Sequence, residues 1–106
     1  DSLQQLAEME IDLILPGHGP RIEKPRELIN SRMAFYRQRL EEIYDLLKST
    51  GLQNPYQLAL AYFKGKLNYF DILLAVNETL VNLDLLVHQG RAFEEQIDGV
   101  SVFGVN

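Results

Sequence analysis

The sequence predicts a mainly α fold that ends in a small β-hairpin. Three observations carry this prediction: a long stripe of apolar residues at helical spacing, a helix-start signal followed by a second helical pattern, and an Asp-Gly pair flanked by apolar residues near the C-terminus. The chain has 106 residues, of which 46% are hydrophobic, and a net charge of −5, as expected for one ordinary globular domain. It holds no cysteine and only two histidines, so it cannot assemble a thiolate or histidine-rich metal site by itself.

The first 25 residues predict a short strand followed by a loop, after a stretch at 2–10 whose Leu3, Leu6 and Met9 could line one helical face. Residues Ile11 to Leu15 form an aliphatic run that ends at a Pro-Gly pair, which is typical of a buried strand ending in a turn. Residues 16–20 read Pro-Gly-His-Gly-Pro. Proline lacks the amide donor and glycine allows backbone angles closed to other residues, so this stretch excludes regular structure. We expect a tight loop that displays His18.

A long helix is expected from about Arg26 to Ser49. Apolar residues recur there at alternating steps of four and three residues, which places them on one side of a helix. The stripe consists of Ile29, Met33, Tyr36, Leu40, Ile43 and Leu47. Gly51 supplies a C-terminal stop for this helix.

The remaining residues predict two helices and a hairpin. The motif Asn-Pro-Tyr-Gln at 54–57 is a helix-start signal, with the asparagine as N-cap, for a short helix that ends near Phe63. A second helical pattern covers residues 69–89, and the Asp-Gly pair at 98–99 is a strong hairpin signal. A helix-turn-helix unit followed by a hairpin is the winged-helix arrangement. The predicted fold is therefore a winged-helix domain preceded by a long helix and a short strand-loop remnant.

Two parts of the sequence resemble metallo-β-lactamase-fold hydrolases. The run from Asp12 to Pro20, with its Pro-Gly-His-Gly-Pro motif, resembles the end of their catalytic domain. The residues that follow and also resemble this family are Ile22, Pro25, Ile29, Arg37 and Arg39. A small winged-helix domain follows the catalytic core in the branch that includes glyoxalase-like and endoribonuclease-like hydrolases. The residues that resemble it are Ala75, Thr79, Leu83, Leu86, Gly90, Asp98 and Gly99.

The resemblance implies the C-terminal part of a longer enzyme. In that family two metal ions are held mainly by an H-x-H-x-D-H run, a further histidine, a bridging aspartate and a last histidine, and His18 matches only the last. Residues 1–25 would then be the end of the catalytic domain, and residues 26–106 the long helix with the winged-helix-like domain. The longer protein would hydrolyse an ester, thioester or phosphodiester with zinc or another divalent metal. Alone, this chain is expected to bind no metal and to be inactive, because one imidazole cannot complete a zinc site.

A basic stretch covers residues 21–39 of this acidic chain. Its six basic residues, against the acidic Glu23 and Glu27, are Arg21, Lys24, Arg26, Arg32, Arg37 and Arg39. One interpretation is contact of Arg21 and Lys24 with a phosphate-bearing substrate near the metal site. The favoured alternative is a helix docked on the catalytic core, with its arginines in structural ion pairs.

The C-terminal domain is expected to contact protein and not DNA. Residues 52–106 carry three basic against six acidic residues, which opposes binding to a polyanion. The helical pattern at 69–89 offers more apolar surface than a short helix and a hairpin can cover. Two interpretations stay open: this surface is core only, or part of it also forms an interface that consists of Phe70, Leu73, Leu80, Leu83 and Leu86. The surplus would pack on the long helix, on the catalytic domain or on a second copy of the chain. No apolar run reaches the length of a membrane helix, and the lack of cysteine fits a cytoplasmic protein.

Overall fold

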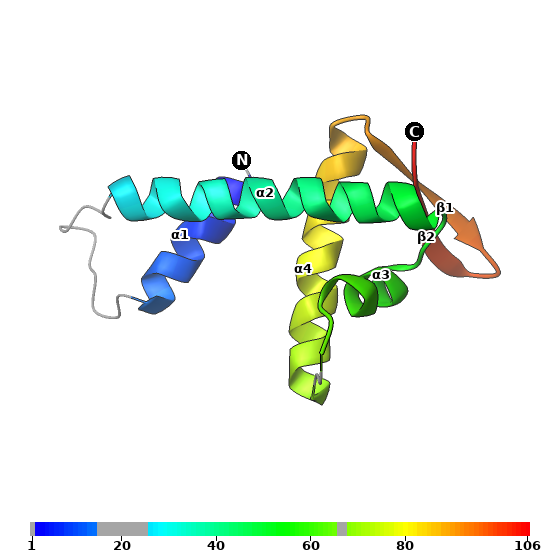
Figure 1. Cartoon of the computed structure of the whole chain (residues 1–106), viewed down its shortest axis with the longest axis horizontal. Helices are drawn as coiled ribbons and strands as arrows, with labels where there is room; N and C mark the ends of the chain where they lie inside the picture. The colour runs from blue at the N-terminus through cyan, green and yellow to red at the C-terminus, as the bar shows by residue number, and fades with distance from the viewer. Residues whose placement is uncertain (1, 15–25, 66–67) are drawn as a thin grey trace. The chain divides into compact units, whose positions relative to one another are not determined.

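The computed structural model describes residues 2–14, 26–65 and 68–106, and these residues form a mainly α fold with a C-terminal hairpin (Figure 1). The elements are α1 (Ser2–Ile14), α2 (Arg26–Thr50), α3 (Pro55–Tyr62), α4 (Tyr69–His88), β1 (Ala92–Ile97) and β2 (Val100–Val105). The chain divides into two compact units, Asp1–Arg39 and Leu40–Asn106, and α2 contributes to both. The domain boundary predicted at residue 25 falls outside the described residues and stays a prediction.

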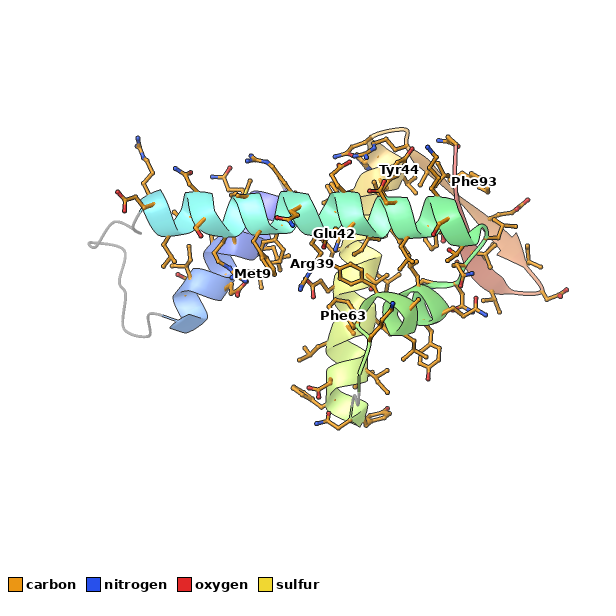
Figure 2. All side chains as sticks on the ribbon, in the orientation of Figure 1. Met9, Arg39, Glu42, Tyr44, Phe63 and Phe93 are labelled. Atoms are coloured by element: carbon orange, nitrogen blue, oxygen red, sulfur yellow. The ribbon has the colours of Figure 1, made fainter. Side chains whose placement is uncertain are left out.

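The predicted strand at the N-terminus is wrong over its described part, because residues 11–14 form the last turn of α1. Leu3, Ala7 and Ile11 are buried at four-residue spacing, so the apolar residues belong to one helical face that begins near Ser2. A short aliphatic run does not by itself separate a strand from a buried helical turn. A helix also satisfies its own backbone, whereas a strand needs a partner strand. Met9, labelled in Figure 2, is exposed on another side of α1.

The long helix α2 confirms the prediction almost residue for residue, since it begins at Arg26 and ends at Thr50. Five members of its apolar stripe are buried, namely Met33, Tyr36, Leu40, Ile43 and Leu47. Just after the helix, the Gly51 amide donates to the Leu47 carbonyl at 3.0 Å, which caps one of the carbonyls left open at a helix end.

Asparagine side chains begin both shorter helices. The Asn54 side chain accepts from the Gln57 amide at 2.7 Å, and the Gln57 side chain accepts from the Asn54 amide at 3.2 Å, so the predicted capping box is confirmed. Helix α4 has a second cap that the sequence prediction missed, because the Asp71 amide donates to Asn68 Oδ1 at 2.8 Å. These local hydrogen bonds explain why the two helices begin where they do.

The end of α4 turns the chain into the hairpin. Gly90, at φ 74°, donates to Val87, and the next amide, that of Arg91, donates to Leu86. Both bonds together make a Schellman motif, in which the left-handed residue is ordinarily glycine. Strands β1 and β2 then pair antiparallel from Ala92↔Val105 to Ile97↔Val100.

The turn between the strands has the geometry that its sequence predicts. Asp98 and Gly99 have φ angles of 52° and 78°. Positive φ at both central residues defines the type I′ turn, whose twist matches that of the paired strands.

Helix α4 is the element of the second unit against which the others pack. Helix α3 packs against α4, and α4 packs against β1. The segment between α2 and α3 also joins the hairpin, because Gln53 and Phe103 exchange backbone hydrogen bonds of 3.0 and 2.8 Å. The largest fully buried side chains of this unit are Ile43, Leu47, Leu58, Thr79, Asn82, Leu83, Leu86 and Phe103. None of the described helices is long and apolar enough to cross a lipid bilayer.

Candidate functional site

The residues predicted to face a metal and its substrate, His18, Arg21 and Lys24, lie outside the described residues. Their roles stay predictions. Within the ranges 2–14, 26–65 and 68–106, no three histidine, aspartate or glutamate side chains gather as a metal site would require. The other histidine, His88, is exposed at the end of α4.

The predicted interface residues divide into two sets in the structure. Leu83 and Leu86 are completely buried in the second unit and form part of its core. Phe70, Leu73 and Leu80 are exposed by 66%, 45% and 37%. They belong to a larger exposed apolar surface, the α4 face, which consists of Tyr69, Phe70, Leu73, Leu74 and Leu80.

The interface predicted from the sequence did not include two members of the α4 face, Tyr69 and Leu74, which are 78% and 53% exposed. Sequence reasoning also did not place Thr79 and Asn82 in the core, where both are at most 1% exposed. These two polar residues share the inner side of the helix with Ala75, Leu83 and Leu86. The number of apolar residues therefore does not tell which of them are covered, and only the side of α4 that packs inward separates the α4 face from the core.

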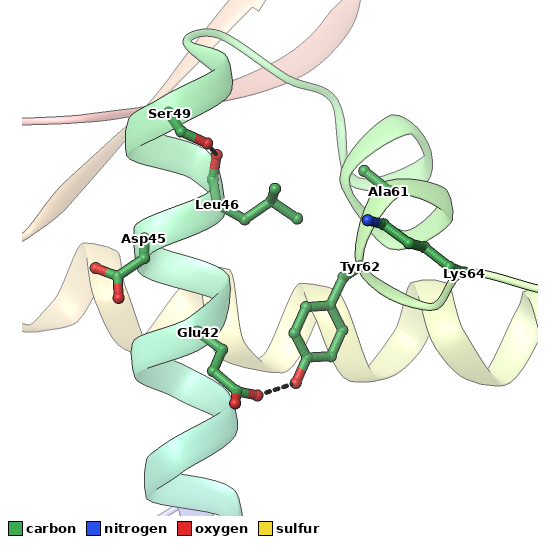
Figure 3. A pocket seen from close by; sticks show the side chains of 7 residues that line it. All are labelled: Glu42, Asp45, Leu46, Ser49, Ala61, Tyr62 and Lys64. Atoms are coloured by element: carbon green, nitrogen blue, oxygen red, sulfur yellow. Dashed lines mark hydrogen bonds between the residues drawn. The ribbon is translucent and has the colours of Figure 1, made fainter.

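A hollow of about 540 Å³ with a mixed polar and apolar lining lies between the second half of α2 and the end of α3 (Figure 3). Its lining consists of Glu42, Asp45, Leu46, Ser49, Ala61, Tyr62 and Lys64. The Tyr62 hydroxyl donates to Glu42 Oε1 at 2.5 Å, and Figure 3 shows these two side chains pointing toward each other. The Ser49 hydroxyl is turned back to the Leu46 carbonyl at 2.8 Å. The hollow is thus a mixed polar surface with its hydroxyl donors already engaged.

A charged cluster holds the first unit together. Arg32 and Tyr36 of α2 both donate to the carboxylate of Glu10 on α1. Burial opposes ionisation of Glu10, but the hydrogen bonds from Tyr36 and Arg32 outweigh it and hold the pKa of Glu10 below its ordinary value. Burial, together with the hydrogen bond to Glu10, raises the pKa of Tyr36.

The favoured reading of the basic stretch, as structural ion pairs, fits what Arg32 does. Its guanidinium lies 4.6 Å from the ring centroid of Phe35, and that of Arg39 lies at 4.6 Å from the same ring. These arginines are engaged in local contacts within the first unit. Arg26 and Arg37 are exposed.

Comparison with known proteins bears on the fold. No protein-family model matches this sequence, and no curated protein matches it. Among solved structures, the crystal structure of a beta-lactamase domain protein from Burkholderia ambifaria superposes with a TM-score of 0.67. The fold matches part of that protein. The match covers 76% of this chain at 23% sequence identity.

The beta-lactamase domain protein is much the longer of the two, since the chain spans only 24% of it. At this identity the likeness concerns the fold. It agrees with the sequence resemblance, which placed this chain within a small part of a larger hydrolase.

Proposed function

We propose that this chain is the C-terminal part of a metallo-β-lactamase-like, metal-dependent hydrolase and is inactive alone. The observation that carries the proposal is the fold match to 24% of a beta-lactamase domain protein. It is supported independently by the Pro-Gly-His-Gly-Pro motif at residues 16–20. The proposed substrate is an ester, thioester or phosphodiester, with the C-terminal domain walling the substrate cleft.

The proposal assigns residues 26–106 to a long helix and a winged-helix domain. The order α2, α3, α4, β1 and β2 supports this, because two helices followed by a hairpin form the core of that arrangement. The backbone pairing of Gln53 with Phe103 supports it further, since it adds an isolated antiparallel bridge beside the hairpin.

The metal requirement is not met by the described residues, which hold no cluster able to bind zinc or another divalent ion. The proposal therefore assigns His18 as a single ligand that acts only with ligands from the preceding part of the longer protein. Arg21 and Lys24 are proposed to contact a substrate phosphate there. No catalytic step is assigned to the residues of this chain.

The proposal is tested by measuring the metal content and the activity of the longer protein that contains this chain. We expect the purified protein to carry a divalent metal measurable by plasma mass spectrometry, and His18→Ala to lose most of it together with esterase or phosphodiesterase activity. His88→Ala is the matched control, because it removes the chain's other histidine and should leave both quantities unchanged. Equal metal content in the two variants, or a longer sequence that lacks an H-x-H-x-D-H run, would contradict the proposal.

A second candidate function is protein association through the α4 face. Its apolar side chains are exposed in a chain whose C-terminal 55 residues carry six acidic and three basic residues. That charge opposes DNA binding, for which we expect no mobility shift at low salt and micromolar protein. Association and the hydrolase role are compatible, since one concerns α4 and the other the residues near His18.

A further inference from the structure

The α4 face belongs to one side of the helix that the rest of the second unit leaves uncovered. Residues three and four apart lie above each other on a helix. The outward side therefore carries, in order, Phe70, Leu73, Leu74, Asn77, Leu80, Val81 and Asp84. The buried side is formed by Ala75, Thr79, Asn82, Leu83 and Leu86. The outward side is thus distinct from the core and accessible to a partner.

The outward side is symmetric about Asn77. An apolar pair, Leu73 and Leu74, precedes this asparagine by four and three residues, and a second pair, Leu80 and Val81, follows it by three and four. A two-fold interface needs such self-complementarity, because residue i of one copy meets residue j of the other and j meets i. If two α4 helices lie antiparallel with Asn77 at the axis, each apolar pair meets the opposite pair of the second copy.

The polar residues of this side also suit a second copy. Two Asn77 amides facing each other can exchange hydrogen bonds, because each has donors and an acceptor. A single polar residue within an apolar helix contact fixes register in this way. Farther out, Asp84 would lie opposite Phe70 in the first turn of the other α4, where the helix dipole favours a negative charge.

Repulsion between the two Asp84 side chains is small in this arrangement. The two Asp84 side chains would be separated by 14 helical residues, or roughly 21 Å at about 1.5 Å per residue. This exceeds the screening length of about 8 Å at physiological salt. Helix α4 contains no lysine or arginine, so a parallel pair would instead place its acidic residues side by side.

We propose that the α4 face binds the α4 face of a second copy of this chain, antiparallel and with the two Asn77 residues at the two-fold axis. The pairing deepens the proposed association role and does not depend on the hydrolase assignment. A buried aromatic side chain covers about 150–250 Å², so Phe70, which is 66% exposed and the largest side chain of the outward side, supplies a large share of the contact. Because the proposed contact involves one helix face of each copy, we expect a weak dimer with a dissociation constant in the micromolar range.

The first test is sedimentation velocity on the 106-residue chain across a concentration series. We expect a monomer–dimer equilibrium, and a weakening of dimerisation by at least about tenfold in Leu73→Glu. Leu60→Glu is the matched control, since Leu60 is 40% exposed on α3 and outside the α4 face. A monomer at every concentration, or equal effects of the two substitutions with unchanged circular dichroism, would overturn the proposal.

The second test measures how the two α4 helices are oriented, and it uses substitutions that are expected to leave the chain folded. The chain contains no cysteine, so Asn77→Cys and Asp84→Cys each introduce a single thiol at an exposed position. A disulfide requires β-carbons about 3.5–4.5 Å apart, which residues near the axis approach and residues roughly 21 Å apart do not. We expect oxidation to crosslink Asn77→Cys at least about tenfold faster than Asp84→Cys. Equal rates, or a faster Asp84→Cys, would exclude the antiparallel pair centred on Asn77.

Discussion

Arg91 donates to both carboxylate oxygens of Glu41, with nitrogen–oxygen distances of 2.7 and 2.6 Å. The two residues are 50 positions apart in the sequence, so this paired contact ties the segment before β1 to α2 within the second unit. The guanidinium also lies 4.3 Å from the ring centroid of Tyr44, a residue labelled in Figure 2. The hydrogen bond from Arg91 lowers the pKa of Glu41, and that to Glu41 raises the pKa of Arg91.

Removing this contact should destabilise the second unit slightly. Both side chains are partly exposed, at 30% for Arg91 and 56% for Glu41, so solvent screens much of the charge interaction. We expect Arg91→Ala to lower the free energy of unfolding by about 1 kcal/mol, including the lost stacking on Tyr44. Arg91→Lys should restore less than half, because lysine lacks the planar fork. Urea denaturation measures both, and full rescue by lysine would show that charge alone matters.

The cluster around Glu10 predicts a loss of stability in acid. Because the pKa of Glu10 is lowered in the folded chain, its carboxylate contributes stability that is complete above the ordinary value of 4.5. That contribution disappears as the pH falls through the lower folded-state value. We expect the wild-type melting temperature to fall more steeply between about pH 5 and about pH 3 than that of Glu10→Gln.

The matched control for this acid effect is Glu8→Gln on the same helix, which should keep the wild-type pH dependence. Thermal melts followed by circular dichroism measure all three proteins. Parallel curves for the wild type and Glu10→Gln would contradict the role assigned to the hydrogen bonds from Arg32 and Tyr36.

We expect any side chain at position 99 to lower the stability of the folded chain, because it must adopt the backbone angles of the hairpin turn. Nothing lies within 4 Å of a β-carbon built there, so the cost is purely that of holding φ at 78°. We expect Gly99→Ala to destabilise the chain by about 1 kcal/mol in a urea titration. Asp98→Asn is the control, because Asn-Gly also favours a type I′ turn, and it should change the midpoint little. A neutral Gly99→Ala would indicate that the turn changes type.

We expect an apolar side chain to be tolerated at position 82 in the core. Asn82 is 1% exposed, and its amide nitrogen donates to the Glu78 carbonyl at 2.9 Å. Its Oδ1 has no hydrogen-bond partner among the described residues. Burying an unpaired polar atom is unfavourable, so we expect Asn82→Leu to be neutral or to stabilise by up to about 1 kcal/mol. Asn82→Asp should destabilise by roughly 3 kcal/mol, because it buries a charge.

Calorimetry of the two Asn82 variants tests this expectation. A loss above about 2 kcal/mol in Asn82→Leu would mean that Oδ1 has a hydrogen-bond partner such as a buried water.

Most helix boundaries could be predicted because their signals are local. The caps at Asn54 and Gly90 and the Asp98-Gly99 turn act through hydrogen bonds or backbone angles within a few residues. The apolar stripe of α2 could also be predicted, since its spacing repeats over the whole helix. The error at residues 11–14 arose where the run was too short to show a period.

The candidate sites were less predictable than the elements. The helical spacing of Leu83 and Leu80 is equally compatible with burial and exposure, yet one is fully buried and the other 37% exposed. Which side of α4 turns inward depends on α3 and the hairpin packing against it. The sequence resemblance supplied the hydrolase interpretation, the match to a solved structure concerns the fold, and His18 itself lies outside the described residues.

The sequence alone therefore determined the mainly α class, the starts and stops of α2, α3 and α4, and the hairpin turn. Only the tertiary structure decided the helical state of Ile11, the exposure of the α4 face, and the pairs Gln53–Phe103 and Arg91–Glu41. The reason is the range of the forces involved. Caps and turns join residues close in the chain, whereas burial and strand pairing depend on residues that the fold brings together from afar.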